Sequence, residues 1–382
     1  MPITKSSKSN ETPMEDATRG HLRPAASSSD KSVRLRVMSG TESIIYTLTD
    51  EQLEQFQRDG YAVFKSAFSK EVAKLCEKEI LEMLRQENNV DVEAPVKARF
   101  LLKRRASAVF DRMITPKLTS GLDRLFGVDG WDSKHFATHG DFFITFPGFA
   151  NTSSKPLQLV GRWHVDLGFQ VVQAHDVHDR NCAFVPAFLI TDSKLDGACT
   201  LVAAGSHKIV ARLLGSARQP ILRQEMVAFC EGYVSQRAGR DTIVQLVGEA
   251  GDVVIMHPLL MHAASANGRD NIRIMGNTGI GGIGKRKIDA SDADRSVADE
   301  IIWQEIKSIP HRTHNEYLLK LFLLLNRYFW TLRYRLRDKW KTKGELKGVD
   351  KLSFRDWGAL PHLLLGPVCT AMTSAIFRVI GC

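Results

Sequence analysis

The chain has 382 residues, 43% of them hydrophobic and 8% aromatic, and a formal net charge of +9. This composition excludes a wholly disordered protein, and the length allows one large domain or two. No segment repeats with a period of about 20 to 50 residues, which excludes a solenoid or a propeller. The positive charge fits an anionic substrate, a membrane surface or nucleic acid and does not choose between them.

The first part of the chain has the composition of a tail rather than of a domain. Residues 1–44 are rich in Ser, Thr, Lys and Arg, and no apolar stretch follows the start, so we expect a disordered tail and a protein that is not secreted. The cysteines are scattered without a CxxC pair, which favours a reduced compartment. We therefore expect an intracellular, cytoplasmic protein.

Local signals then predict helices before the core. Thr49 with Gln52 three residues later is a capping box, which predicts the start of a helix, and Gly60 ends it. The next apolar residues alternate as in a strand, and the pattern after them has helical spacing. The expected elements are a helix at residues 50–58, a strand at residues 61–64 and a helix from about Ser69.

From Asp141 onward the sequence changes to short apolar runs divided by Gly, Pro, Asp and Asn. Runs of this length, with no helices expected between them, indicate an antiparallel sandwich or barrel. The fold class that we expect is therefore mainly β, with helices packed before the β core. The expected strands are residues 142–146, 157–166, 183–191, 200–203, 252–256, 259–264 and 271–278.

Four residues, His164, Asp166, His262 and Arg273, indicate a metal centre. On a strand, His164 and Asp166 share one face because the residue between them points to the other face. A histidine from a distant strand adds a second nitrogen, and two nitrogens with one carboxylate are typical of non-haem Fe(II) oxygenases. Arg273 is expected on the next strand, where a guanidinium binds a carboxylate through two hydrogen bonds. The pattern predicts iron and a 2-oxo acid in one pocket.

A second histidine competes for the ligand position. His257 lies immediately before Pro258, where a turn between strands is expected, so we interpret it as a histidine that hydrogen-bonds a turn. His262 belongs to the strand that follows and is eleven residues from Arg273. We therefore predict that His262 is the ligand.

Several segments together resemble a known family. They are residues 48–52 and 60–63, His164-Val165-Asp166, residues 196–208, residues 251–262, Asn267 and Arg273. In these segments the chain is similar to the phytanoyl-CoA dioxygenase family of Fe(II)/2-oxoglutarate oxygenases, and the resemblance covers residues 45–285. It implies one domain there, folded as a double-stranded β-helix (a cupin-like jelly roll).

The resemblance also implies an activity and its cofactors. Fe(II) would be held by His164, Asp166 and His262, and 2-oxoglutarate by Arg273, with O2 as co-substrate, ascorbate as reductant and no catalytic residue beyond the metal ligands. The implied reaction hydroxylates or otherwise oxidises a small or lipid-like substrate, acyl-linked ones included, with release of succinate and CO2. Pocket-lining residues are expected at Gln158, Arg162, Met275 and Asn277; for Arg162 and Gln158 a structural hydrogen bond is an equal alternative.

Two other functions fit the same pattern. One is a catalytically silent jelly roll that binds a ligand and acts as a membrane-associated interaction module; the complete set of ligands with Arg273 favours the enzyme. The other is a protein hydroxylase, for which the sequence offers no peptide-binding feature. Nucleic acid is not the expected partner, because Gly279 stands where a base-repair oxygenase has a second arginine and no aromatic recognition motif is present.

The last part of the chain, residues 286–382, is expected to be a helical extension. Residues 316–343 are apolar at first and basic afterwards, and the tail after Trp357 is apolar. This stretch either packs on the core or lies as a basic amphipathic helix on an anionic membrane surface. It is not expected to span a bilayer, because charges and prolines interrupt the apolar length that a bilayer requires.

Overall fold

The computed structural model describes residues 48–94, 96–138, 140–151, 159–166, 174–175, 177–178, 181–217, 220–236, 242–277, 280–289, 291 and 294–309. The expected tail at residues 1–44, the pocket residue Gln158 and the amphipathic stretch at residues 316–343 lie outside these ranges. None of the helices within the ranges is long and apolar enough to cross a membrane.

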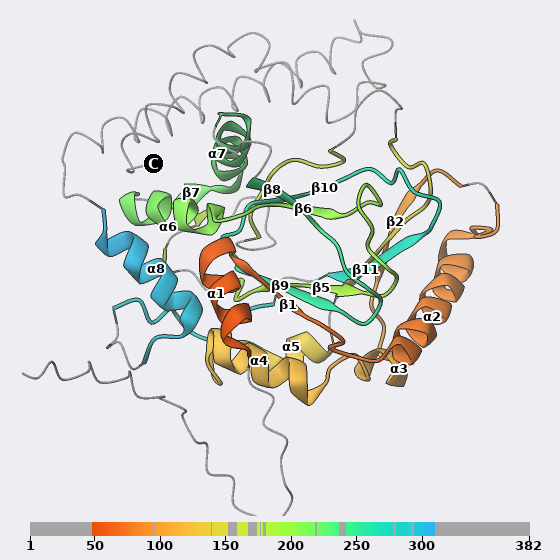
Figure 1. Cartoon of the computed structure of the whole chain (residues 1–382), viewed down its shortest axis with the longest axis horizontal. Helices are drawn as coiled ribbons and strands as arrows, with labels where there is room; N and C mark the ends of the chain where they lie inside the picture. The colour runs from red at the N-terminus through yellow and green to blue at the C-terminus, as the bar shows by residue number, and fades with distance from the viewer. Residues whose placement is uncertain are drawn as a thin grey trace, which may run out of the picture. The chain divides into compact units, whose positions relative to one another are not determined.

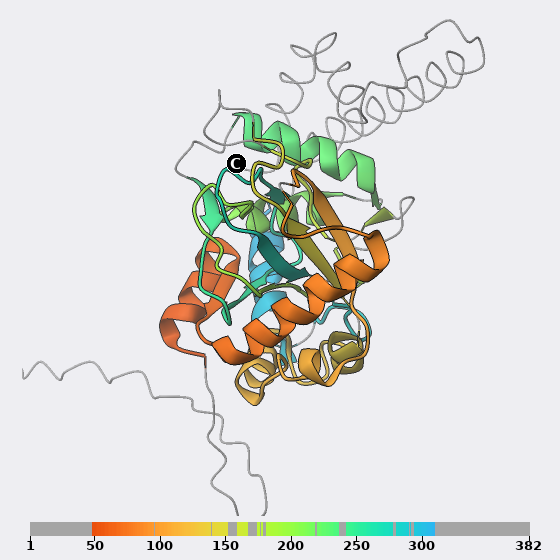
Figure 2. The ribbon, with the colours of Figure 1, turned by 90° about the vertical axis from the view of Figure 1, so that its right-hand side faces the viewer.

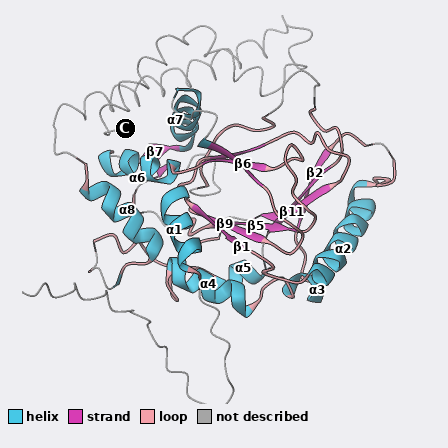
Figure 3. Cartoon of the chain, in the orientation of Figure 1, coloured by secondary structure: helices cyan, strands magenta, loops and turns pink. Residues whose placement is uncertain are grey.

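The described strands form two main antiparallel sheets (Figures 1 and 3). The strands are β1 Tyr61–Phe64, β2 Arg99–Lys103, β3 Asp141–Thr145, β4 Ala174–His175, β5 Val185–Leu189, β6 Thr200–Ala203, β7 Ile221–Leu222, β8 Ile243–Leu246, β9 Val253–Met256, β10 His262–Ala264 and β11 Arg273–Asn277. The major sheet has the order β1-β9-β5-β11-β3-β2, the minor sheet has the order β10-β6-β8, and β4 pairs with β7. The prediction of a mainly β core with helices is confirmed.

Helices lie on the outer sides of the two sheets. They are α1 Asp50–Asp59, α2 Lys70–Asn88, α3 Ala108–Asp111, α4 Pro116–Phe126, α5 Ser133–Thr138, α6 Ser206–Ser216, α7 Arg223–Gln236 and α8 Val297–Lys307. Figure 1 shows α2, α3, α4 and α5 along the side of the major sheet that faces away from β6 and β8, and the turned view in Figure 2 agrees. Helices α6 and α7 lie beyond the minor sheet.

Three apolar clusters join these layers. The first packs α1 to α5 and α8 against the outer face of the major sheet, through residues such as Phe56, Leu118 and Phe188. The second lies between the two sheets, and the third packs α6, α7 and α8 against the minor sheet. Each sheet therefore has an apolar cluster on both faces, and central strands such as β5 and β9 are continuous buried apolar runs.

Strand β5 shows how the sequence produces this layering. All five of its residues are buried. Val185, Ala187 and Leu189 belong to the cluster between the sheets, whereas Phe188 belongs to the cluster under the helices. Side chains alternate between the two faces of a strand, so one apolar run serves two cores.

Several local predictions agree with the structure. Helix α1 begins after Thr49 with the expected capping box and ends at Gly60 in the left-handed conformation, and β1 has the expected bounds. The expectation that no helices lie between the strands is wrong, because α6 and α7 separate β6 from β8. Val210, Leu213 and Leu214 recur at helical spacing on the buried face of α6, a signal that short strands on either side concealed.

The expected strand at residues 157–166 is irregular in its described part. Isolated bridges join Leu159 to Ser265 and His164 to His262. Between these two bridges the chain advances by five residues from Leu159 to His164, but by only three residues from Ser265 to His262 on the opposite segment. The extra residues form a bulge, so the alternation that placed Arg162 and His164 on one continuous face is interrupted.

Gly60 joins α1 to β1 at a position where only glycine fits. Its φ is +86°, and a Cβ atom there would lie 2.5 Å from His207 Nδ1. We expect Gly60→Ala to lower the free energy of unfolding by about 2–4 kcal/mol, from backbone strain and overpacking together. Gly284 is the matched control, because its φ is +70° and nothing lies within 4 Å of an added Cβ. We expect Gly284→Ala to lower the free energy of unfolding by only about 1 kcal/mol. Urea unfolding measures both, and equal losses would contradict the packing argument.

Two buried histidines beneath this junction make the fold acid-sensitive. The rings of His207 and His257 lie 5.1 Å apart. Burial, with the charge of Lys208 adding to it, lowers the pKa of His207 to about 3. Below about pH 6.5 the unfolded chain therefore takes up a proton that the folded chain excludes, and stability falls by about 1.4 kcal/mol per pH unit until the folded pKa is reached. We expect the free energy of unfolding, measured with urea, to decrease less between pH 7 and pH 5 for His207→Phe than for the wild type. Equal decreases would show that His207 is not the source of the acid sensitivity.

Candidate active site

The segment that follows Gly161 brings His164 against His262 at the start of β10. The two residues exchange backbone hydrogen bonds, 3.1 Å from His164 N to His262 O and 2.9 Å from His262 N to His164 O. Their rings lie 4.4 Å apart between centroids. Two imidazoles that are 98 residues apart in the sequence thus share one side of the β core.

Backbone carbonyls fix the tautomer of both rings. Nδ1 of His164 donates to the Arg162 carbonyl at 2.8 Å, and Nδ1 of His262 donates to the Leu260 carbonyl at 3.0 Å. Because a carbonyl oxygen only accepts, each Nε2 keeps its lone pair while the ring is neutral. This is the arrangement by which proteins orient histidine ligands of a metal.

Asp166 completes the group. Its carboxylate oxygens lie 3.7 Å from His164 Nε2 and 3.5 Å from His262 Nε2. One ligand atom from each of the three residues lies within 4.8 Å of the others. Two imidazole nitrogens and one carboxylate suit iron in a site that keeps open positions, so the donor set fits Fe(II).

The charges in this group favour the forms that bind a metal. Burial acts to raise the pKa of Asp166, but His262 and His164 together lower it. Burial and the neighbouring His262 lower the pKa of His164. For His262, burial acts to lower the pKa, and Asp166 raises it overall. Asp166 is therefore ionised and His164 neutral near neutral pH, and His262 and Asp166 together favour a bound cation, such as a proton or a metal ion.

The outer side of the His-x-Asp segment is anchored to the third cluster. Trp163 and Val165 are buried there beside residues of α6 and α7. Arg162 Nε donates to Glu231 Oε1 of α7 at 2.6 Å, and Nη2 pairs with the other oxygen. The alternating pattern of the motif thus turns Trp163 and Val165 outward and leaves His164 and Asp166 to face the metal position.

Arg273 begins β11, and its side chain is 3% exposed. Its Nη2 donates to Thr200 Oγ1 at 3.4 Å and to Met275 Sδ at 2.9 Å, while its Nε has no hydrogen-bond partner. Within the described ranges it forms no ion pair. Burial, together with the positive charge of Arg99, lowers its pKa to about 10. A buried guanidinium is costly without an anion, so this site fits a carboxylate ligand.

Asn267 holds the turn that leads into β11. The residue is fully buried, and its amide nitrogen donates to the carbonyls of Thr145 and Asn271 at 3.1 and 3.0 Å. Its side-chain oxygen accepts from Arg269 N at 3.1 Å. Asn267 therefore fixes the register at which Arg273 enters the sheet.

A cavity of about 290 Å³ lies between the sheets at this place. Its volume is at the lower end of the range for small-molecule sites, roughly 300–1,000 Å³. Its lining residues are Arg99, Asp141, Phe143, Gly161, His164, Asp166, Thr200, His262, Ala263, Ala264, Met275 and Asn277. Arg273 is not itself a lining residue, but it donates hydrogen bonds to two of them, Thr200 and Met275.

The structure brings most of the expected residues to this cavity. The three metal-ligand candidates line it together with Met275 and Asn277. Arg162 is not among the lining residues, and its ion pair with Glu231 matches the structural alternative. His257 lies in a turn, where its Nδ1 accepts a hydrogen bond from Leu259 N at 3.1 Å, so it is not part of the metal group.

Among the lining residues that the sequence analysis missed, two are charged. Arg99 lies on β2, with its guanidinium carbon 4.7 Å from the centre of the Phe143 ring. Asp141 begins β3. Neither residue was indicated by a strong sequence pattern. The segment Arg99-Phe100-Leu101-Leu102-Lys103 lacks a clear alternation of polar and apolar residues, and Asp141 lies just before the strand expected at residues 142–146.

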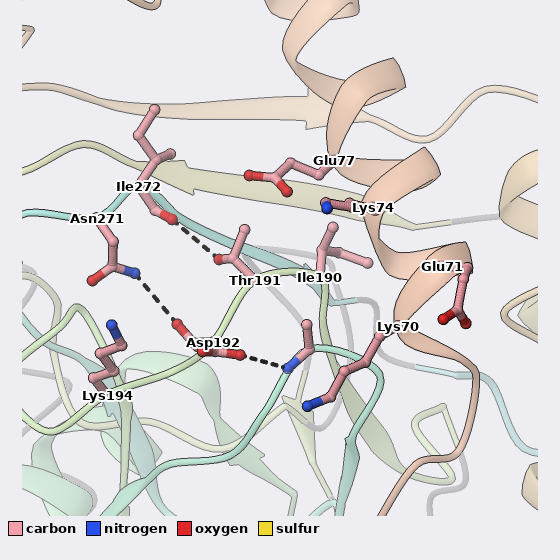
Figure 4. A pocket seen from close by; sticks show the side chains of 11 residues that line it. Lys70, Glu71, Lys74, Glu77, Ile190, Thr191, Asp192, Lys194, Asn271 and Ile272 are labelled. Atoms are coloured by element: carbon pink, nitrogen blue, oxygen red, sulfur yellow. Dashed lines mark hydrogen bonds between the residues drawn. The ribbon is translucent and has the colours of Figure 1, made fainter.

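A second, larger cavity of about 620 Å³ opens between α2 and residues 190–194 (Figure 4). Lysines and acidic residues are mixed around it, and some of its polar groups are hydrogen-bonded to the protein itself. Thr191 donates to the Ile272 carbonyl at 3.1 Å, and Asp192 accepts from Ala250 N at 2.9 Å. Within the described residues, the three-residue group that could hold a metal lies in the first cavity and not in this one.

Comparison with known proteins agrees with this geometry. The family model of phytanoyl-CoA dioxygenase (PhyH) matches residues 56–275. The chain belongs to the phytanoyl-CoA dioxygenase family. Ectoine dioxygenase of Stutzerimonas stutzeri (strain A1501) is 25% identical over 237 residues, which is 57% of this chain and 71% of that protein.

Two solved structures are similar to part of the chain. A non-heme alpha-ketoglutarate-dependent carbocyclase, SnoK from nogalamycin biosynthesis, is 15% identical with a TM-score of 0.45, over 63% of this chain and 87% of that one. EctD from S. alaskensis is 18% identical with a TM-score of 0.43, over 65% of this chain and 81% of that one.

Family membership makes the chain an oxidoreductase of the Fe(II)/2-oxoglutarate-dependent dioxygenase class. Its cofactor is Fe(II) and its co-substrate is 2-oxoglutarate. The His-Asp-His group in the cavity is consistent with that metal.

Proposed function

We propose that His164, Asp166 and His262 are the iron ligands and that Arg273 binds 2-oxoglutarate. The observation that carries this proposal is the meeting of two features at one cavity. Three ligand atoms lie within 4.8 Å of one another, and a buried guanidinium without an ion-pair partner in the described ranges lies behind the cavity wall. One feature suits a divalent metal and the other a dicarboxylate.

Arg99 is proposed as a second cation for the co-substrate. Arg99 and Arg273 both pair in register with Thr145, from the two sides of β3. Side chains at the same register position share a face of the sheet, so both guanidiniums serve the same end of the cavity. An anion between them offsets both burial and the repulsion from Arg99, the two causes that lower the pKa of Arg273.

The chain's own groups orient and protect the reaction. The carbonyls of Arg162 and Leu260 hold both imidazoles with Nε2 toward the metal position, and Asp166 supplies a charge that selects a cation. Arg273 orients 2-oxoglutarate through charge-assisted hydrogen bonds. When bound, Fe(II) supplies the redox chemistry with O2 that couples decarboxylation of 2-oxoglutarate to oxidation of the substrate.

We also propose that the two sheets are the halves of a double-stranded β-helix. The major and minor sheets face each other across the second apolar cluster, and the ligands come from the segment beside β10 and from β10 itself. The family model supports this arrangement, because it spans the strands that bear the site.

The proposed substrate is a small or lipid-like molecule, with acyl-linked compounds among the candidates. The relative in Stutzerimonas stutzeri is named for ectoine, a small molecule, and the cavity has the size of a small-molecule site. Contact with a membrane surface through residues 316–343 stays a prediction, since those residues lie outside the described ranges.

The test is a substrate screen with the full-length chain, Fe(II), 2-oxoglutarate, ascorbate and air. A fatty acyl-CoA, the matching free fatty acid and small polar compounds are compared, with succinate and the oxidised product measured by mass spectrometry. We expect iron-dependent succinate formation and at least one compound that raises it while being oxidised in equal amount. Absence of any iron-dependent succinate would contradict the proposed function.

A further inference from the structure

One end of the active-site cavity carries hydrogen-bond acceptors that the reaction described above does not use. Asp141 of β3 and Asn277 of β11 are direct partners in the antiparallel register. Both line the cavity that contains His164, Asp166 and His262. Side chains of directly opposite residues on one face lie about 5 Å apart at Cβ, so the carboxylate and the amide form one pair.

Neither acceptor is satisfied by the part of the protein that the structure describes. Asn277 Oδ1 is buried without a hydrogen-bond partner. The Asp141 carboxylate forms no hydrogen bond or ion pair with any described residue, and burial raises its pKa although Lys103 acts in the opposite direction. Burying acceptors without donors costs free energy, and no described residue donates a hydrogen bond to this pair. Lys103, an exposed residue that pairs in register with Asp141, acts on it only through its charge.

The acceptor pair lies opposite the guanidinium end of the cavity. Arg273 and Asn277 are four steps apart on β11, as are Thr145 and Asp141 on β3. At the rise of a strand this separation is about 13 Å. The cavity is therefore polarised. Arg99 lines one end, with Arg273 behind the wall there, and a carboxylate with an amide oxygen lines the other end. A dicarboxylate is attracted to the first end and repelled from the second.

We propose that Asp141 and Asn277 bind a positively charged nitrogen, a protonated amine or an amidinium, on the substrate that is oxidised. This inference rests on the proposed function and narrows its substrate class. A cationic nitrogen supplies both the donors that the two oxygens lack and the charge that offsets a half-buried carboxylate. A neutral hydroxyl supplies only the donor, and an anionic group is excluded by repulsion.

The test compares three probes that share a ring and differ in one group: benzylamine, which is protonated at neutral pH, benzyl alcohol and benzoate. They are titrated by ligand-observed NMR into the full-length chain loaded with Zn(II) and 2-oxoglutarate, so that no turnover occurs. We expect benzylamine to bind about tenfold more tightly than benzyl alcohol, as a partly buried charge-assisted contact implies. Benzoate is expected to bind most weakly.

Two variants connect this preference to the acceptor pair. Asp141→Asn keeps the shape and removes the charge, so the preference should shrink to within about twofold. Asn277→Asp adds a charge and should strengthen benzylamine binding, a gain that a misfolded protein cannot produce. Asp129→Asn, at an exposed residue outside the cavity, is the matched control and should keep the wild-type preference.

The outcomes separate this inference from the function on which it rests. Equal binding of benzylamine and benzyl alcohol, an unchanged preference in Asp141→Asn, or tightest binding of benzoate would overturn the inference. Binding of 2-oxoglutarate to the same Zn(II)-loaded chain is measured in parallel. If 2-oxoglutarate binds while the amine preference is absent, only the inference fails; if 2-oxoglutarate does not bind, the proposed function fails.

Discussion

Replacement of Asp166 by alanine is expected to lower the rate of succinate formation by about two orders of magnitude or more. Loss of a partner that merely orients a metal ligand costs about 10- to 100-fold, and Asp166 is proposed as a ligand itself. It is also the only carboxylate in the His-Asp-His group. Its removal leaves two neutral imidazoles, which hold a divalent cation far less tightly.

Metal content shows whether the loss has this origin. Wild-type, Asp166→Ala and Asp129→Ala proteins are loaded anaerobically with Fe(II), desalted and analysed for iron, with succinate formation measured on the same samples. We expect Asp166→Ala to lose iron and activity together, and the exposed control to keep both. An Asp166→Ala protein that retains wild-type activity would contradict the assignment of the ligands.

Replacement of Arg273 by leucine is expected to raise the KM for 2-oxoglutarate by roughly 10- to 100-fold, because hydrogen bonds to charged groups contribute about 1.5–3 kcal/mol. The side chain is 3% exposed, and its Nε has no hydrogen-bond partner among the residues that the structure describes. Leucine fills part of the space and offers no charge. The iron content of the variant should stay at the wild-type level, since Arg273 is not among the metal ligands.

Two further variants locate the origin of this effect. Arg273→Lys keeps the charge and loses the planar two-pronged geometry, so its KM should lie between those of wild type and Arg273→Leu. Arg124→Leu removes an exposed arginine of α4 and should leave KM unchanged. A wild-type KM in Arg273→Leu would assign the co-substrate carboxylate to another residue, with Arg99 first to be tested.

Local physics accounts for the parts of the fold that the sequence predicted well. The Thr49 cap, the Gly60 stop and strand β1 are decided by neighbouring residues, and the structure has them at the expected places. The alternation in His164-Val165-Asp166 is equally local: Val165 packs outward while the two polar residues lie together. Such features need no knowledge of distant segments.

Other features depended on contacts that no short pattern contains. The bulge between Leu159 and His164 follows from how that segment pairs with residues 262–265, so a strict alternation misplaced Arg162. Helices α6 and α7 are stabilised by packing on the minor sheet. From the sequence, neither a helix nor a strand was expected between residues 203 and 252.

The cavity residues also divide into those that local sequence indicates and those that depend on distant contacts. His262 was favoured over His257 because Pro258 predicts a turn, and the structure has the turn. Arg99 and Asp141 were missed because each becomes part of the cavity only through the register of β2, β3 and β11. Register is a property of paired strands, and a single unaligned sequence does not specify it.

An anaerobic titration of 2-oxoglutarate into the Fe(II)-loaded, full-length chain tests directly whether one cavity holds both the metal and the co-substrate. Binding is measured by the visible charge-transfer absorption of a chelated Fe(II)–2-oxo acid complex. We expect a saturable band at a stoichiometric amount of iron, no band in Asp166→Ala, and a band that requires far more 2-oxoglutarate in Arg273→Leu. Absence of the band in a wild-type protein that has bound iron would contradict the central claim that one cavity holds both the metal and the co-substrate.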